Sequence, residues 1–389
     1  MLARLIRIRR DERGMSLVFV SVAFIALLSA TTIAIDVGMF MTARSQAQNS
    51  ADAGAIAGAT ALVFNNYSDR SPGGPAVQSA VNTALRNTVQ GANVSVTPAD
   101  VTFPLDPTGL PNRVAVTVYR TSARSNAVTT LMGGFFGLPT ADVAATATAE
   151  ASPANGIGCV KPFTIPDRWV EVRNPPWNSL TSTYDRYYMN GNQAGQLLSP
   201  ADYYPDANQP NYAGYNMTSD VGTLLTIRAG TGNNVSPSFY FSWSMPGGIG
   251  ASWYTTNIAQ CNPTVAHIGD IMTQEPGNMV GPTNAGVDLL MAQDPNAYWD
   301  TYCNCVRGSA FRSSPRVFPI PLYDPEYYQS GVVTGRNVTL RVANWIGFFL
   351  VGRNGNDVLG RITPILGVVD TNAGPAPTGA FSRAIRLVE

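Results

Sequence analysis

The sequence predicts an α+β protein with a long N-terminal transmembrane and stalk helix, a small α/β unit, and a mainly-β disulfide-stabilised domain. Three observations support this fold class. A charge-free apolar block covers residues 15–35, and alanines and glycines recur at helical spacing just after it. Beyond Ser152 the chain becomes dense in Tyr, Trp, Pro, Gly and Asn, and all four cysteines lie there. A chain of 389 residues has room for an anchor and two folded units.

The apolar block has the length of a membrane-spanning helix. At 1.5 Å per residue it covers about 30 Å, which is the thickness of a bilayer core. Asp36 follows the block, whereas arginines precede it at positions 4, 7, 9, 10 and 13. The positive-inside rule therefore predicts a cytoplasmic basic tail at residues 1–14, a transmembrane helix at 15–35 and export of the rest. A cleaved secretory signal is the alternative, but the block is longer than a usual signal core.

Residues 36–63 are expected to continue the helix, because the segment contains no proline, and to form with the apolar block a stalk of about 70 Å. Its small residues fall on one face and allow another helix to approach closely. We expect this stripe to pack against other helices, and packing on the protein's own globular part is the alternative. The stripe consists of Ala47, Ala51, Gly54, Ala55, Gly58 and Ala59.

Residues 64–152 are expected to form the small α/β domain. A turn-rich break at 65–74 precedes a helix at 75–90 that starts with proline. Strands are predicted by alternation, and a short helix is expected at 126–136. The order predicts a small sheet with helices on one face. The expected strands are 93–97, 114–119 and 143–151.

Residues 153–389 are expected to form the mainly-β exported domain. Helical periodicity fades here, except at the start of the segment 283–299. A second apolar run at 343–352 is too short to span a bilayer and is typical of a buried strand. The strand candidates are 224–228, 238–243, 317–321, 338–342 and 345–351.

The cysteines agree with export, because an even number in an oxidising compartment indicates disulfides. Cys303 and Cys305 are so close in sequence that a mutual bridge is expected to be strained. Each is therefore expected to pair with one of Cys159 and Cys261, in either order. A zinc site is the alternative, but there is no second close pair and only His267 to add.

The sequence indicates no catalytic residues, no cofactor and no metal site. His267 is the only histidine, and no nucleophile elbow, zinc-protease motif or phosphate-binding loop occurs. Asp288, Asp294 and Asp300 are spaced by six, and carboxylates of this kind can hold calcium. Helix caps and solvated turns are the favoured explanation, because the spacing fits no EF-hand loop and Asp-Pro at 294–295 is a common turn signal. A net charge of zero with 13% charged residues gives no reason to expect nucleic acid as a partner. We predict that the protein is not an enzyme, and a hydrolase using carboxylates is the least favoured reading.

Aromatic residues are dense between positions 169 and 254. Such side chains suit recognition surfaces because they combine an apolar face with a polar tip. They equally suit the bracing of a loop-rich β-domain, which we favour. The recognition reading gives an alternative function, a membrane-anchored adhesin or a binder of envelope or surface glycans. The residues are Trp169, Trp177, Tyr184, Tyr187, Tyr188, Tyr203, Tyr204, Tyr212, Tyr215, Trp243, Trp253 and Tyr254.

The N-terminal segment contains a set of short motifs: Glu12-Arg13-Gly14, Ile35-Asp36-Val37-Gly38 and the runs 43–48 and 51–59 (ARSQAQ and ADAGAIAGA). With these motifs it resembles the TadE/TadG-like proteins of Flp (tight adherence) pilus systems. The resemblance covers residues 10–62 closely and residues up to 150 more loosely, where Phe135-Phe136-Gly137 precede the small-residue strand. It implies a TadG-like, minor-pilin-like role in pilus assembly at the bacterial inner membrane, with lipid and other Tad components or pilin helices as partners.

Two departures from the family pattern matter. Some members carry a von Willebrand A module, but its D-x-S-x-S metal motif is absent here. The resemblance also implies a candidate prepilin-type cleavage between Gly14 and Met15. Prepilin peptidase usually meets Glu at the fifth mature position, whereas this chain has Phe19.

Overall fold

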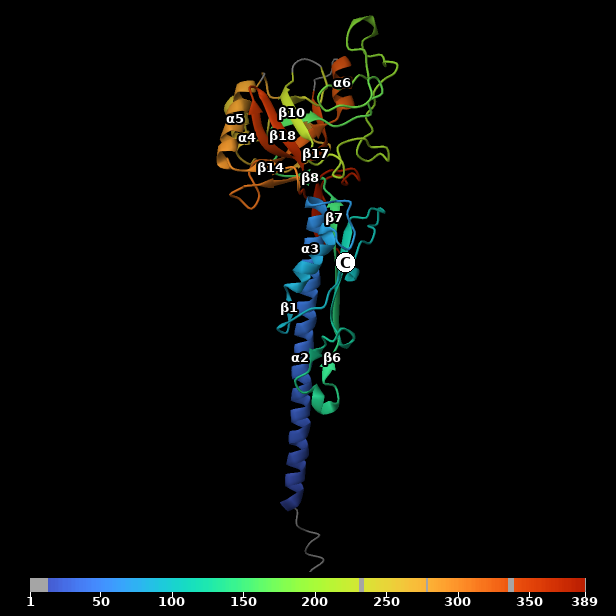
Figure 1. The fold of residues 1–389 in the computed structure, drawn as a ribbon, viewed down its shortest axis with the longest axis vertical. Helices are drawn as coiled ribbons and strands as arrows, with labels where there is room; N and C mark the ends of the chain where they lie inside the picture. Colours follow the sequence, from blue (N-terminus) through green and yellow to red (C-terminus); the bar gives the residue numbers. More distant parts are fainter. Residues whose placement is uncertain (1–12, 231–233, 278, 335–338, 389) are drawn as a thin grey trace, which may run out of the picture. The chain divides into compact units, whose positions relative to one another are not determined.

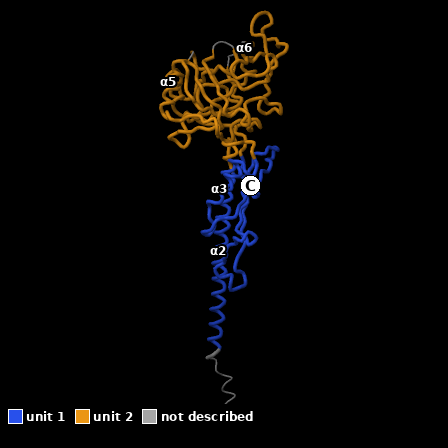
Figure 2. Tube along the Cα trace, in the orientation of Figure 1, with its two compact units in different colours: residues 1–59, 70–150, 387–389 blue, residues 60–69, 151–386 orange. Residues whose placement is uncertain are grey.

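The computed structural model describes residues 13–230, 234–277, 279–334 and 339–388 (Figure 1). These residues form two compact units (Figure 2). Unit 1 is drawn from residues 13–59, 70–150 and 387–388, and unit 2 from residues 60–69 and 151–386. The predicted fold class is confirmed, since a long apolar helix precedes a mainly-β domain that contains a β-barrel. The five-part division expected from the sequence stays a prediction, and the tail at residues 1–12 lies outside the described residues.

Unit 1 is organised around α2, a single helix from Arg13 to Phe64 whose last residues belong to unit 2. Strand β4 (Arg113–Arg120) pairs antiparallel with β7 (Val143–Pro153), from the pair Arg113–Glu150 to the pair Arg120–Val143. Along β4 the side chains alternate between buried and less buried, as expected for a strand with one face on the core. Buried valines of β4 thereby face the helices. The other elements are α3 (Pro75–Leu85), β1 (Thr88–Val89), β2 (Ala92–Asn93), η1 (Pro98–Asp100), β3 (Val101–Thr102), β4 (Arg113–Arg120), η2 (Ser122–Arg124), β5 (Val128–Thr129), η3 (Gly133–Phe136), β6 (Thr140–Ala141) and β7 (Val143–Pro153).

The helix expected at 126–136 is wrong. The segment forms a hairpin instead, in which β5 pairs with β6 and η3 lies at the tip. Gly137 adopts φ +77°, and a Cβ at Gly133 would meet the Leu138 carbonyl oxygen at 2.5 Å. Both positions require glycine in the turn, and paired glycines weaken a helix.

The helix expected at 75–90 is confirmed in its first part and ends at Leu85. The strand expected at 93–97 is wrong. β2 ends at Asn93, Ser95 makes only an isolated bridge to Tyr119, and the short helical turn η1 begins at Pro98.

Unit 2 contains a six-stranded closed barrel. Its strands follow the order β17-β16-β9-β11-β10-β18, and β18 closes the barrel by pairing back to β17. The pairs β9–β16 and β10–β11 are parallel and the other four are antiparallel. The barrel strands are β9 (Phe163–Pro166), β10 (Leu224–Ala229), β11 (Phe239–Ser242), β16 (Val317–Tyr323), β17 (Leu340–Asn354) and β18 (Asp357–Thr363).

The strand expected at 338–342 begins at Leu340 in the structure, and residue 338 lies outside the described residues. It joins the strand expected at 345–351 in one long strand, β17, whose residues 345–350 are fully buried. The remaining strands expected in unit 2 match β10, β11 and β16, and α5 ends at Gln293, before a short strand. Figure 1 shows α4 and α5 beside the barrel strands. The other elements are β8 (Gly156–Ile157), η4 (Gly191–Gln193), α4 (Ala251–Ala259), β12 (Ala266–His267), β13 (Ile271–Met272), α5 (Val280–Gln293), β14 (Tyr298–Asp300), β15 (Cys305–Arg307), α6 (Pro325–Val333) and β19 (Arg383–Val388).

One apolar cluster joins alternate residues of the barrel strands to α4 and α5. Phe163, Phe318 and Phe348 meet within it, with ring centroids about 6 Å apart. Ile258 of α4 packs over Gly286 of α5, where a Cβ would meet it at 2.7 Å. Glycine at this position therefore sets how closely the two helices approach.

The expected disulfide pairing is wrong. Cys159 pairs with Cys261, and Cys303 pairs with Cys305. Asn304 adopts φ +48° at the tip of the β14–β15 hairpin, which brings the Cα atoms of its two neighbours to 5.2 Å, a normal disulfide separation. The spacing of the two cysteines alone does not reveal this left-handed turn.

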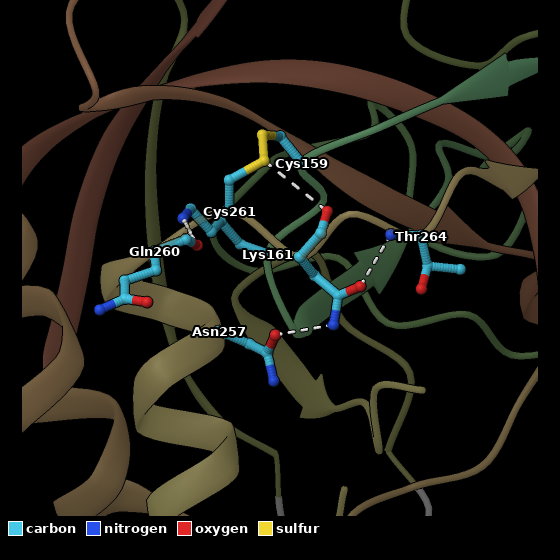
Figure 3. Close-up of a disulfide and its surroundings, with 7 residues drawn as sticks. Cys159, Lys161, Asn257, Gln260, Cys261 and Thr264 are labelled. Carbon is cyan, nitrogen blue, oxygen red and sulfur yellow. Dashed lines mark hydrogen bonds between the residues drawn. A yellow bond between two sulfur atoms is a disulfide. The ribbon is translucent and has the colours of Figure 1, made fainter. Parts of the chain in front are cut away.

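The Cys159–Cys261 bridge closes a loop between the start of the barrel and the end of α4 (Figure 3). Beside it, the Lys161 ammonium donates to the Gln260 carbonyl oxygen at 2.5 Å. The Asn257 carboxamide oxygen accepts from the side chain of Asn262 at 2.8 Å, which holds the chain after the bridge against α4. The disulfide and these hydrogen bonds thus connect the end of α4 to the segment that precedes β9.

The two disulfides should differ in their effect on stability. Cys159 and Cys261 are 102 positions apart, and a disulfide that closes so long a loop restricts the unfolded chain strongly. Replacing both by serine should therefore lower the unfolding free energy by about 4–5 kcal/mol. Replacing Cys303 and Cys305 opens a separation of only 2 and should cost about 1–2 kcal/mol. Urea unfolding of the full chain in detergent, followed by the fluorescence of the six tryptophans, measures both. Equal losses in the two double variants would contradict the pairing.

Candidate membrane-anchoring and assembly helix

The N-terminal half of α2 is an exposed apolar surface. Of the described helices, only α2 is long and apolar enough to cross a membrane. Side chains of residues 15–35 are almost all exposed within the chain. The hydroxyls of this half bond back to the helix, as Ser21 does to the Leu17 carbonyl and Thr31 to the Leu27 carbonyl, both at 2.8 Å. These bonds satisfy the hydroxyls without water, as a lipid environment requires.

Asp36 marks the end of this half. Its carboxylate accepts backbone N–H bonds from Leu131 at 2.9 Å and from Met132 at 3.2 Å, and only 8% of the residue is exposed. The hairpin tip is thereby tied to α2 one residue beyond the apolar block. The sequence marked Asp36 as a flanking charge and as part of the family motif, but no local signal linked it to residues almost a hundred positions away.

The C-terminal half of α2 is the core of unit 1. Ala47, Ala51, Ala55 and Ala59 are buried, and so are Gly54 and Gly58. A Cβ at Gly54 would meet the Ala80 carbonyl oxygen and the Ala84 Cβ at 3.1 Å. A Cβ at Gly58 would meet a Val114 methyl at 2.8 Å and the Ala80 Cβ at 3.1 Å. The small residues do allow close approach of a helix, but that helix is α3 of the same unit.

The expectation that this stripe packs against another protein's helix is therefore corrected. Its two glycines lie against α3 and β4 and its alanines are buried, as in the alternative considered from the sequence. Polar contacts fix the same arrangement. Ser50 donates to the Ala84 carbonyl at 3.0 Å, the Gln46 side chain accepts from the Gln90 N–H at 2.7 Å, and Gln48 donates to the Thr146 carbonyl at 3.2 Å.

Other candidate residues from the sequence serve separate contacts. Asp288 pairs with Arg353, Asp300 with Arg307, and Asp294 accepts from the hydroxyls of Ser309 and Ser314. The structure does not bring these three carboxylates together, and no group of three metal-type ligands occurs among the residues it describes. His267 lies 3.0 Å from an Asp370 carboxylate oxygen through its Nε2. Cleavage between Gly14 and Met15 stays a prediction.

Half of the aromatic residues considered for recognition are buried in unit 2, and most of the others are half-buried. Trp169 packs edge-on against Trp177 and Tyr184, with centroid distances of 6.2 and 5.5 Å. Tyr188 and Tyr203 are more exposed. The set therefore braces the loops around the barrel, and its burial gives no support to a glycan-binding surface.

Asp167 is a buried carboxylate that sequence reasoning missed. It follows β9, is fully buried, and accepts hydroxyl bonds from Tyr212 at 2.6 Å and Tyr204 at 2.8 Å. Burial raises the pKa of Asp167 to about 6, although these hydrogen bonds act in the opposite direction. These hydrogen bonds join Tyr204 and Tyr212 to the end of the barrel strand β9. The carboxylate has no access to solvent, so we assign it a structural role.

Asp167 should make the stability of unit 2 depend on pH. Its folded pKa lies above the ordinary 3.8, so the native state binds the proton more tightly between pH 4 and 6 and the stability falls as the pH rises through this window. Relative to Asp167→Asn, the wild-type unfolding free energy should fall by up to about 3 kcal/mol from pH 4 to pH 7. Urea unfolding of both proteins at several pH values measures this difference. The contributions of the other carboxylates cancel, because the two proteins share them. A difference that does not change with pH would contradict the assignment.

Enlarging the stripe should loosen unit 1. Leucine at Gly54 or Gly58 places atoms where α3 and β4 already lie, and overpacking of this kind costs about 1–3 kcal/mol. Amide hydrogen exchange in α3 should accelerate about ten- to hundred-fold in the full chain. Gly38→Leu is the matched control, because nothing lies within 4 Å of its added Cβ. Unchanged α3 protection in both stripe variants would show that the packing is not required.

Comparison with known protein families gives a match within α2. Residues 14–61 match the family model described as "Putative Flp pilus-assembly TadE/G-like". No curated protein and no solved structure matches the chain. The matched residues begin in the first turn of α2 and end three residues before its last residue, so they contain both the exposed half and the buried half. Over residues 14–61 the chain is thus similar to the putative TadE/G-like domain of Flp pilus-assembly proteins.

Proposed function

We propose that this chain is a TadG-like, non-enzymatic component of Flp pilus assembly, held in the bacterial inner membrane by α2. The observation that carries the proposal is the coincidence of the family match with one helix whose first half is exposed and apolar. A soluble protein would bury such a surface, because exposed apolar area of this extent is unfavourable in water. The family match and the helix together indicate membrane anchoring.

The proposed orientation places the N-terminus in the cytoplasm and both units on the other side of the membrane. The arginines before the apolar block support it by the positive-inside rule. The two disulfides of unit 2 support it independently, because such bridges persist in oxidising compartments.

The proposed mechanism is assembly by contact. Because α3 and β4 occupy the small-residue stripe, contacts with pilin helices fall to the exposed residues 15–35 within the bilayer. Van der Waals packing drives helix association in lipid, so the order of side chains along the helix matters as well as their hydropathy. A non-enzymatic role is supported by His267 and the three aspartates, which take part in structural contacts.

Deletion of the gene should reduce surface Flp pili, counted by electron microscopy, and the wild-type chain should restore them. A variant with residues 15–35 in scrambled order keeps the composition and hydropathy of the span but loses its side-chain pattern. It should reach the membrane in normal amounts and restore fewer pili. Normal piliation after deletion would contradict the proposed function, and full rescue by the scrambled span would reduce the role of α2 to anchoring.

A further inference from the structure

The β5–β6 hairpin of unit 1 has an apolar tip that the anchoring helix alone does not explain. Residues 130–141 (TLMGGFFGLPTA) contain no charged side chain. Phe135 is 85% exposed, and three further large apolar side chains of the tip, those of Leu131, Phe136 and Leu138, are more than half exposed. Water would normally disfavour such a cluster at the end of a short hairpin.

The tip lies against the end of the apolar block of α2. Ile33, Val37 and Phe40 of the helix and Gly133, Phe136 and Leu138 of the hairpin line one apolar groove of about 450 Å³. Asp36 ties the tip to this level through the N–H groups of Leu131 and Met132. Figure 1 shows β6 beside α2, nearer the N-terminal end of the helix than β1 or α3.

The carboxylate of Asp36 does not interrupt the apolar surface here. It is covered by the hairpin, and beyond it Val37 and Met41 remain exposed on the helix. The surface of α2 thus stays apolar for about 40 Å from Met15 to Met41, which is more than a hydrocarbon core and close to the thickness of a bilayer with its interfacial regions.

Charge returns at the same level on both segments. Arg44 is the first exposed charged residue of α2 after the apolar block, and Asp142 is the first charged residue after the hairpin tip. Both line a second groove that also contains Met41 and Val143. The helix α2 and the β5–β6 hairpin therefore change from apolar to charged side chains at the same level along the helix axis.

We propose that the tip of the β5–β6 hairpin inserts into the non-cytoplasmic interface of the bilayer beside α2, with lipid acyl chains as its occupant. The argument rests on the membrane anchoring in the proposed function, because the medium that surrounds residues 15–35 also surrounds side chains packed against Ile33 and Val37. Phe135 and Phe136 then act as a second anchor. Together with α2 they fix the height and rotation of unit 1 on the membrane, which a single helix leaves free.

Single cysteines on the full chain test this proposal, because the four native cysteines form disulfides and leave no free thiol. Phe135→Cys reports on the tip. Leu105→Cys is a matched control, because Leu105 is an exposed leucine of the same unit. It precedes β4, whose first residue pairs with Glu150, near the end of β7 that is farther from the hairpin tip. Leu27→Cys, in the exposed apolar block, reports on anchoring itself.

Each variant is labelled with an environment-sensitive fluorophore and reconstituted into phosphatidylcholine vesicles containing nitroxide-labelled phosphatidylcholine. The probe at 135 should lose emission about as strongly as the probe at 27, and much more than the probe at 105. Quenching at 135 no greater than at 105, with strong quenching at 27, would overturn the inserted tip and leave anchoring intact. A probe at 135 shielded from both lipid nitroxide and aqueous iodide would also overturn it, in favour of a protein contact. No quenching at 27 would instead reject anchoring.

Discussion

The close packing of α2 against α3 and β4 is the interaction on which unit 1 depends. It is possible only because the side chains at the contact are small, with glycine at positions 54 and 58 and alanine at 80 and 84. Protein interiors pack densely, so a gap or an extra methyl group at such a contact would lower the stability of the unit. This packing makes the C-terminal half of α2 the core of a folded unit. It also removes that half from contacts with other helices.

Asp36 separates two environments along one helix. Before it, apolar side chains face outward and hydroxyls bond to their own helix. After it, the buried stripe and the polar contacts of Gln46, Gln48 and Ser50 hold the sheet and α3. The carboxylate itself is satisfied by two backbone N–H groups of the hairpin, so it adds a tertiary link where the environment changes. The family match covers both halves, which is consistent with a domain that joins anchor and folded unit.

Features encoded by neighbouring residues could be predicted from the sequence. Hydropathy predicted the apolar helix, and alternation predicted β4 and β7. The hairpin at 126–141 was missed because its apolar spacing also suits a helix, and the steric role of Gly133 depends on the Leu138 carbonyl. Barrel closure through β17 and β18, and the hydrogen bonds from Tyr204 and Tyr212 to Asp167, join residues with no shared local pattern. Such pairings are fixed by tertiary packing, which overrides local propensity.

The central claim is that α2 changes from a lipid-facing to a water- and protein-facing helix between Asp36 and Arg44. Single cysteines at the exposed positions Val18, Ile25, Ser45 and Asn49 of the full chain, in native membranes, test it with a membrane-impermeant maleimide added from outside. The account predicts modification at 45 and 49 and protection at 18 and 25 until detergent is added. Modification at 18 or 25 in intact membranes, or protection at 45 and 49, would contradict it.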